Sequence, residues 1–242
     1  MISYYLMTDK GDRGNNEDNV GMYRMGQEYC FTLADGFGGH GKGEVASQIA
    51  VEQAVKTFAQ IGKASGECLA EAFQSGQNEI LEMQRRDRTA GDMKTTLVLL
   101  LVGEELIRWG HIGDSRLYYF ENGRLVGRTM DHSVPQMLVA AVEIKEKQIR
   151  RHPDRNRLRR VMGVDWEEPR YQMAEPIKST SGQAFLLCSD GFWEWIEEKK
   201  MTACLKKAST PQMWLESMAE IVRRQGRGQN MDNYSAVGVW IN

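Results

Sequence analysis

The apolar residues of this chain recur with two different spacings, and each spacing predicts one kind of element. Short runs of β-branched and apolar residues, bounded by glycine, asparagine or aspartate, are typical of strands. Such runs predict strands over residues 29–34, 95–102, 106–112, 117–120, 125–129, 184–188 and 234–241. The first of these runs stops at Asp35-Gly36, where we expect a turn. Asn122-Gly123 separates two other runs and predicts a two-residue hairpin.

Other segments carry apolar residues at intervals of three and four, which favours amphipathic helices. This spacing predicts helices over residues 44–61, 67–86, 134–150, 191–207 and 211–225. The resulting order is neither a βαβ repeat nor an all-β chain. It favours an α+β fold in which antiparallel sheets carry helices on their outer faces. Since no linker divides the chain, we expect a single domain over residues 1–242.

Composition narrows the class of protein without identifying its chemistry. With 41% hydrophobic and 26% charged residues over 242 positions, the chain has ordinary globular values and enough length to bury a core. Thirty-one basic against 33 acidic residues give a net charge of -2, which argues against a nucleic-acid-binding surface. The longest apolar run, residues 97–102, is far too short to cross a membrane.

The amino terminus and the cysteines point to a cytoplasmic protein. Residues 1–12 lack the basic lead and the apolar stretch of a secretory signal. Cys30, Cys68, Cys188 and Cys204 are widely spaced and form no C-x-x-C pair, so we expect reduced thiols rather than a zinc or redox site.

Five acidic positions stand at the ends of predicted strands, beside glycine or asparagine. They are Glu17-Asp18, Asp35-Gly36, Asp114, Asp190-Gly191 and Asp232-Asn233. A carboxylate pressed against a core edge is unfavourable unless it is paired or binds a metal. Oxygen ligands with few histidines point to Mg²⁺ or Mn²⁺. Each Asp-Gly is equally suited to a simple turn, so spacing alone leaves both interpretations open.

The motifs around these positions resemble those of the protein phosphatase 2C family, the metal-dependent Ser/Thr phosphatases, in its short bacterial form. Eight blocks match in order and spacing and together cover nearly the whole chain. They are residues 13–18, 33–47, 95–97, 111–118, 131–133, 152–156 with 162–163, 187–191 and 232–233. The resemblance implies a four-layer αββα sandwich, with two antiparallel sheets flanked by helices and a flap at about residues 134–165.

The same resemblance implies a centre with two Mn²⁺ or Mg²⁺ ions. In it, Asp35 bridges both metals and Gly36 offers its backbone carbonyl, while Asp18, Asp190 and Asp232 complete the ligand set. Asp114 matches the family's ligand for a third, weaker divalent metal. The implied reaction is direct attack on phosphorus by a hydroxide that bridges the two metals, with no phospho-enzyme.

Two further residues receive catalytic roles from the resemblance. Arg13 matches the phosphate-binding arginine, whose planar fork holds two phosphate oxygens. His40 is a candidate for protonating the leaving oxygen, with a structural role in the glycine loop as the alternative. His111, His132 and His152 are expected to be structural.

Several residues depart from the family pattern. Only one residue separates Gly11 from Arg13, and Phe37 stands where eukaryotic members place a histidine. Glu194 replaces an aspartate near the third metal, and Lys94 replaces a glycine before the Thr-Thr pair. The longer arm of Glu194 puts the affinity of the third site in question.

We therefore expect a phosphoprotein phosphatase acting on phosphoserine and phosphothreonine. The alternatives are a catalytically weak or inactive module with the same fold, and a phosphatase for small phosphorylated metabolites. The expected partners are phosphorylated proteins and a cognate Ser/Thr kinase, with no nucleic acid and no membrane, and we expect a monomer. The basic segment 145–160 would either recruit acidic substrates or form an ordinary solvated face.

Overall fold

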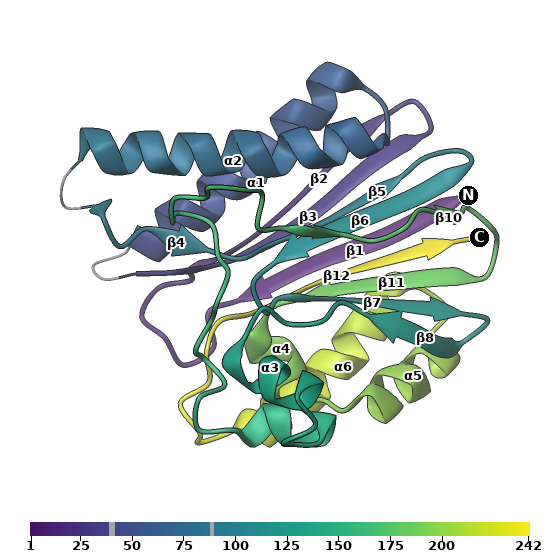
Figure 1. Ribbon diagram of the computed structural model, residues 1–242. Coiled ribbons are helices and arrows are strands. Elements are labelled where there is room, and N and C mark those ends of the chain that lie inside the picture. Colours follow the sequence, from purple (N-terminus) through teal and green to yellow (C-terminus); the bar gives the residue numbers. More distant parts are fainter. Residues whose placement is uncertain (39–41, 88–89) are drawn as a thin grey trace.

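Two antiparallel sheets pack face to face and are covered by helices on both outer sides (Figure 1). The computed structural model describes residues 1–38, 42–87 and 90–242. The five-stranded sheet has the order β1 (Ile2–Asp9), β12 (Tyr234–Ile241), β11 (Gln183–Cys188), β7 (Arg116–Glu121) and β8 (Arg124–Arg128). The seven-stranded sheet has the order β10 (Ile177–Lys178), β6 (Leu106–Ile112), β5 (Leu97–Val102), β3 (Glu28–Phe37) and β2 (Asp18–Met25), with β4 (Lys94–Thr95) on β3 and β9 (Gln172–Met173) on β6.

The alternation of side chains along each strand builds three apolar layers. Residues of the inner faces meet between the sheets, among them Phe31, Leu33, Leu100, Phe185, Leu187 and Val237. The alternate residues point outward and are buried again beneath the helices. Every residue of β5 is buried, as expected for a strand covered on both faces. Each such fully buried apolar side chain contributes about 1.5–3 kcal/mol of transfer free energy.

The helices form the two outer layers. α1 (Lys42–Ile61) and α2 (Gly66–Arg86) cover the seven-stranded sheet, and α6 (Pro211–Gly226) and α5 (Glu198–Lys207) lie against the other sheet together with the short α4 (Asp190–Trp193) (Figure 1). Ser65 caps α2 by accepting a hydrogen bond from the backbone N–H of Cys68. The predicted αββα sandwich is thus confirmed. In the described parts of the chain, none of the helices has both the length and the apolar character that a membrane crossing requires.

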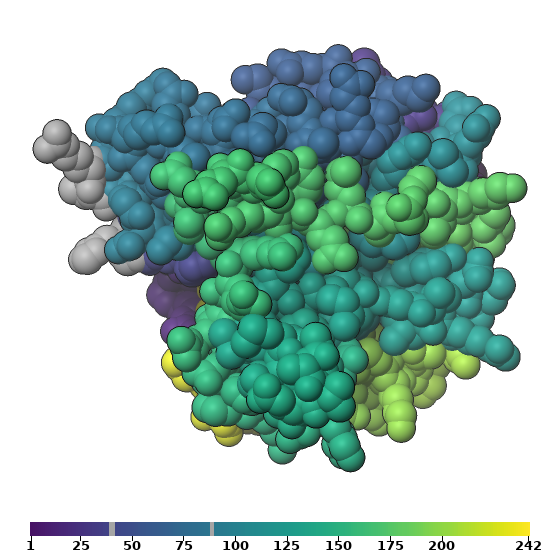
Figure 2. Space-filling view, in the orientation of Figure 1, coloured from purple at the N-terminus to yellow at the C-terminus, as the bar shows by residue number. Residues whose placement is uncertain are grey.

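The predicted helix over residues 134–150 is wrong, because the chain reverses within it. α3 (Val134–Ala140) is followed by a break and then by the 3-10 helix η3 (Glu146–Arg151). Val142 has a positive φ of 61° and is 88% exposed, so it cannot belong to a continuous apolar face. In Figure 2 this flap stands at the lower front of the molecule.

The predicted helix over residues 191–207 is likewise two helices, with a break between Trp193 and Glu198. The guanidinium of Arg150, reaching from η3, donates to the backbone oxygens of Trp193 and Ile196. Because the Arg150 side chain donates to these carbonyl oxygens, they need no hydrogen bonds from a following helical turn. The same two bonds attach the flap to the body of the protein.

Two strand predictions also need correction. β3 does not stop at Asp35 but continues through Gly36 to Phe37, and the strand predicted over residues 95–102 divides into β4 and β5. β1 and β2 were not predicted at all. Glycine and asparagine in β2 are poor strand formers, but a Cβ on Gly21 would lie 2.6 Å from Val51 of α1, so close helix packing requires glycine there.

Candidate metal centre

The predicted acidic residues converge because strand ends from both sheets meet at one edge of the sandwich. Asp18 begins β2 and lies opposite Asp35 of β3 in the strand register. In the other sheet, the backbone N–H of Ser189, just after β11, donates to Ser235 O of β12. The hydroxyl of Ser189 also donates to Asp18 Oδ2 at 2.7 Å and so joins the two sheets. These strand ends lie opposite the two chain termini (Figure 1).

A cleft of about 370 Å³ opens at this edge. Most of the predicted site residues line it, namely Arg13, Asp35, Gly36, Asp114, Asp190 and Asp232. Asp18 is only 6% exposed and lies beneath the cleft. His40 lies outside the described residues.

The carboxyl groups interact strongly enough to shift one another's pKa. Desolvation, followed by repulsion from Asp18 and Asp190, raises the pKa of Asp35 well above its usual range. Desolvation also raises the pKa of Asp18 to about 7 and that of Asp190 to about 6. The charge of Asp190 is also one of the causes that raise the pKa of Asp35. Without a cation, this cluster therefore holds protons that isolated aspartates would have lost.

The donor set fits a hard divalent cation. Asp18 Oδ1 is buried without a hydrogen-bond partner, which is costly unless something else satisfies it. At Gly36 a Cβ would lie 1.9 Å from the carbonyl oxygen of Gly43, so only glycine brings its backbone into the cleft here. Within the described residues no three acidic, histidine or cysteine side chains form a complete ligand group by themselves. Backbone oxygen and water would have to complete the coordination, as is usual for Mg²⁺.

Arg13 lies in the cleft and pairs with one of the predicted metal ligands. Its Nε and Nη2 donate to the two carboxylate oxygens of Asp232, both at 2.9 Å. This interaction is the main cause that raises the pKa of Arg13. The two side chains are 45% and 42% exposed, and such pairs contribute at most about 1 kcal/mol. The guanidinium can therefore exchange Asp232 for another anion at little cost.

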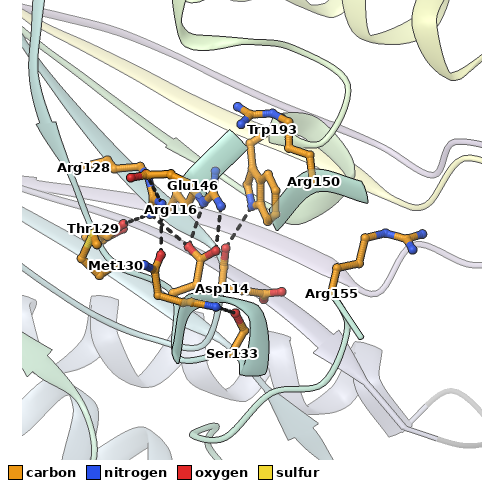
Figure 3. A network of polar contacts seen from close by, with 12 residues as sticks. Asp114, Arg116, Arg128, Thr129, Met130, Ser133, Glu146, Arg150, Arg155 and Trp193 are labelled. Atoms are coloured by element: carbon orange, nitrogen blue, oxygen red, sulfur yellow. Dashed lines mark hydrogen bonds and ion pairs between the residues drawn. The ribbon is translucent and has the colours of Figure 1, made fainter. Parts of the chain in front are cut away.

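A second, fully buried charge network supports the cleft from behind (Figure 3). Arg116 donates through Nε and Nη2 to both oxygens of Asp131, at 2.8 and 2.7 Å. Its guanidinium lies 3.4 Å from the centroid of the Trp193 ring. The indole N–H of Trp193 in turn donates to the backbone oxygen of Asp114 at 2.9 Å. Arg116 and Trp193 thereby fix the backbone of a predicted metal ligand.

The same network extends into the flap. Arg128 contacts Asp131 and also donates to Glu146 of η3. Arg150 of η3 pairs with Glu198 at 2.8 Å. Arg150 belongs to the basic segment 145–160 and Arg128 ends β8, and both hold the flap against the body of the protein.

The carboxylate of Glu194, one of the residues that depart from the family pattern, also forms an ion pair within the protein. It pairs with Arg155 at 2.8 Å. Desolvation and then the nearby charge of Asp190 raise the pKa of Glu194 to about 7. Arg150 and Arg155 are therefore engaged inside the protein, which leaves only other residues of the basic segment 145–160 to recruit a substrate.

The described histidines are packed within the protein, as expected. His111 and His132 stack with ring centroids 4.6 Å apart, and burial lowers the pKa of His132 to about 3. His152 accepts a hydrogen bond from the backbone N–H of Asp154.

Sequence reasoning assigned no role to three residues that the structure places at the site. The hydroxyl of Thr96 accepts from the backbone N–H of Asp35, and Ser189 bonds to Asp18. Asn233 lines the cleft and bonds to the loop that carries Arg13. All three lie inside motif blocks, so their position was a usable signal, but their partners are too distant in sequence to be predicted.

Comparison with known proteins identifies the family of this chain. The family model described as protein phosphatase 2C matches residues 11–234. The chain is 30% identical over 98% of its length to the serine/threonine protein phosphatase PstP of Mycobacterium tuberculosis, but spans only 44% of that protein. It is 31% identical over 84% of its length to the serine/threonine phosphatase stp of Listeria monocytogenes, of which it covers 82%.

A solved structure gives the same result for the fold. The catalytic domain of PstP in complex with two manganese ions superposes with a TM-score of 0.81 at 26% identity, covering 99% of this chain and 97% of that one. The match of the family model over most of the chain, together with relatives at 30% identity or more, shows that the chain belongs to the protein phosphatase 2C family.

Proposed function

We propose that this protein is a metal-dependent phosphatase that hydrolyses phosphoserine and phosphothreonine in proteins. The observation that carries the proposal is the gathering of Asp18, Asp35 and Asp190 around one cleft, where desolvation and mutual repulsion raise each pKa. Divalent cations relieve this repulsion. The relatives named as Ser/Thr protein phosphatases support the reaction class.

We propose that two Mn²⁺ or Mg²⁺ ions bind here, with Asp35 shared between them. The remaining ligands would be the backbone oxygen of Gly36 and the carboxylates of Asp18, Asp190 and Asp232. Bound divalent ions supply a nucleophile from water at neutral pH and stabilise the charge that develops on phosphorus. Asp114 would hold a third, weaker ion, with Glu194 already engaged by Arg155.

Arg13 binds the phosphate in this scheme. Its fork now grips the two oxygens of Asp232, and two phosphate oxygens have the same planar geometry. If Asp232 served as a metal ligand, its carboxylate would no longer occupy the guanidinium of Arg13, which would then be available to the substrate phosphate. Arg13 then orients the phosphoryl group and neutralises part of its charge without any proton transfer.

The departing serine or threonine oxygen needs a proton. His40 stays the predicted donor, with the alternative that it only stabilises the glycine loop. None of the described histidines lines the cleft, and burial lowers the pKa of both His111 and His132.

The substrate is proposed to be a protein segment, supplied by a Ser/Thr kinase. The cleft is rimmed by Asn156 and Leu158 of the flap, which would contact residues beside the phosphorylated one. A metabolite phosphatase would share the mechanism and differ only at this rim. An inactive binding module would be expected to lack part of the carboxylate set, yet all of it is present.

The test is hydrolysis of matched phosphoserine, phosphothreonine and phosphotyrosine peptides, and of sugar and nucleotide phosphates, with Mn²⁺ or with a chelator. We expect turnover of the phosphoserine and phosphothreonine peptides that requires the metal. Asp190→Asn should abolish it, whereas Asp165→Asn, at an exposed carboxylate that does not line the cleft, should not. Turnover without metal, or preference for the small phosphates, would contradict the proposal.

A further inference from the structure

Asn233 makes an unusual set of contacts for a single side chain in the cleft. It is 6% exposed. Its Nδ2 donates to the backbone oxygens of Lys10 and Asn15, at 2.9 and 2.8 Å. Its Oδ1 accepts from the backbone N–H of Glu17 at 2.7 Å. One amide thus holds both ends of the loop between residues 10 and 17, which carries Arg13 at its centre.

The orientation of this amide is fixed by its partners. Two carbonyl oxygens require the NH₂ group on one side, and one N–H requires the oxygen on the other. Reversing the amide would set oxygen against oxygen and lose all three bonds. The side chain therefore selects one arrangement of the loop.

The Lys10 carbonyl ties this contact directly to Arg13. It accepts from the backbone N–H of Arg13 at 3.1 Å as well as from Asn233. A change at Asn233 therefore acts on the turn in which Arg13 itself sits.

The segment before Asn233 holds the same loop by its backbone. Asp12 N–H donates to Met231 O at 3.0 Å, and Met231 N–H donates to Asp12 Oδ2 at 2.9 Å. A Cβ on Gly11 would lie 2.3 Å from the Asp232 carbonyl oxygen, so the loop and the segment touch closely. Residues 231–233 thus carry both a predicted metal ligand, Asp232, and the support for Arg13.

We propose that Asn233 is a positioning residue that sets the guanidinium of Arg13 for the substrate phosphate. This inference rests on the proposed function. Asn233 itself touches neither the phosphate nor the leaving group. It acts by holding the loop against residues 231–233, so that the phosphate-binding fork keeps a fixed position relative to Asp232.

Loss of the amide would release the loop at both ends. In Asn233→Ala the Asn15 carbonyl and the Glu17 N–H lose the partner that Asn233 gave them, and water would replace it only in a loosened loop. Arg13 would then sample many positions, and a phosphate would have to fix it again on binding. The strand β12, which begins at Tyr234, pairs with β1 and β11 whether or not Asn233 is present. Asp232, just before this strand, should therefore stay in place.

The test compares Asn233→Ala, Arg13→Ala and the double variant in the Mn²⁺-loaded protein. Inhibition by inorganic phosphate and the KM for an aryl phosphate report on phosphate binding. Each single variant should weaken phosphate binding by about tenfold. In the Arg13→Ala background, Asn233→Ala should add less than about twofold, because both changes remove the same contact. Effects that multiply would overturn the inference.

Hydrogen exchange gives a readout that does not depend on turnover. In Asn233→Ala, the backbone N–H groups of Arg13 and Glu17 should exchange faster, with or without metal. In Arg13→Ala the N–H of Glu17 should stay protected, since its partner Asn233 is intact. Unchanged exchange in Asn233→Ala would mean that the amide does not hold the loop, and would overturn the inference even if activity fell.

Two controls separate positioning from general loss of stability. Leu69→Ala removes buried side-chain volume near the start of α2, in an apolar cluster that does not include residues 231–233, and should lower thermal stability without changing inhibition by phosphate. If Asn233→Ala folds poorly, Asn233→Ser supplies a smaller change in which a hydroxyl retains part of the bonding.

A wild-type protein without metal-dependent turnover would refute the proposed function itself. Active wild type with unchanged phosphate binding in both Asn233 variants would refute only the positioning role.

Discussion

Asp35 combines an unfavourable electrostatic environment with a proposed role as a metal ligand. Its carboxyl lies among those of Asp18, Asp190 and Asp114, and desolvation with mutual repulsion raises its pKa. A side chain that served only the fold would not be placed in such surroundings, because a neutral amide would fit with less repulsion. The unfavourable position is explained if Asp35 is the carboxylate shared by two cations.

The prediction for Asp35→Asn therefore has opposite signs for stability and activity. The buried carboxyl of Asp35 must take up a proton to avoid repulsion in the metal-free protein, whereas an amide need not. The change should therefore raise the melting temperature of the metal-free protein at pH 7.5 by about 2–4 °C for each 1 kcal/mol gained. Activity with Mn²⁺ should fall by more than about a hundredfold. Mutation of a residue that only hydrogen-bonds to a metal ligand already lowers metal affinity or activity by about 10–100-fold. Thermal unfolding with a chelator and turnover of an aryl phosphate measure the two effects. A variant that keeps its activity would show that Asp35 is not a ligand.

Arg13 and the carboxylates could be named as candidate site residues from the sequence because each lies within a recognisable sequence motif. Asn233 belongs to the same motif as Asp232, but the positioning role proposed for it depends on the backbone groups that its side chain bonds. Those partners are 216 to 223 residues away along the chain. No local pattern indicates which carbonyl groups a buried amide will meet.

Among helices and strands, sequence periodicity missed features that depend on contacts with distant parts of the chain. The hairpin at Asn122-Gly123 and the strand β12 were predicted correctly, because turn chemistry and apolar alternation are local. The break after Trp193 depends on Arg150 of the flap, which bonds to the carbonyls there. β1 is a strand because β12 pairs with it along its whole length, from the other end of the chain.

The buried pair of Arg116 and Asp131 should be a major support of the link between β7 and the flap. Asp131→Asn leaves the buried guanidinium without its counter-charge, and we expect a loss of about 3 kcal/mol or more in the free energy of unfolding. Glu82→Gln removes one partner of the exposed pair with Arg86 and should cost less than about 1 kcal/mol. Urea unfolding of the two variants compares them directly. Equal losses would show that burial of the Arg116 pair has no special weight.

In the molecule as a whole, a rigid sandwich holds a repulsive cluster at one edge. The termini meet at the opposite end, where the amino group of Met1 donates to Asn242 O at 2.7 Å. The two sheets share an apolar layer, so the strand ends that bear the carboxylates cannot easily move apart. The repulsion between the carboxylates therefore lowers the free energy of unfolding of the whole domain. We expect that free energy to depend on pH.

The sign of that dependence follows from the raised pKa values. Asp18 and Asp190 titrate at about 7 and about 6 in the folded protein, against ordinary values of 3.8. Between about pH 4 and pH 7 the folded state thus binds more protons than the unfolded state. The metal-free protein should lose stability as the pH rises through this range, and Mn²⁺ should restore it. Thermal unfolding with a chelator at pH 5 and pH 7.5 measures this. Greater stability at pH 7.5 would contradict the clustering of the carboxylates.

The most direct measurement for the proposed centre is anomalous diffraction at the manganese absorption edge from crystals grown with Mn²⁺. We predict two strong peaks in the cleft with the carboxylate of Asp35 between them, and the backbone oxygen of Gly36 and the side chains of Asp18, Asp190 and Asp232 around them. Absence of any peak in the cleft at saturating Mn²⁺, or peaks only at surface carboxylates, would contradict the proposed metal centre and the phosphatase mechanism built on it.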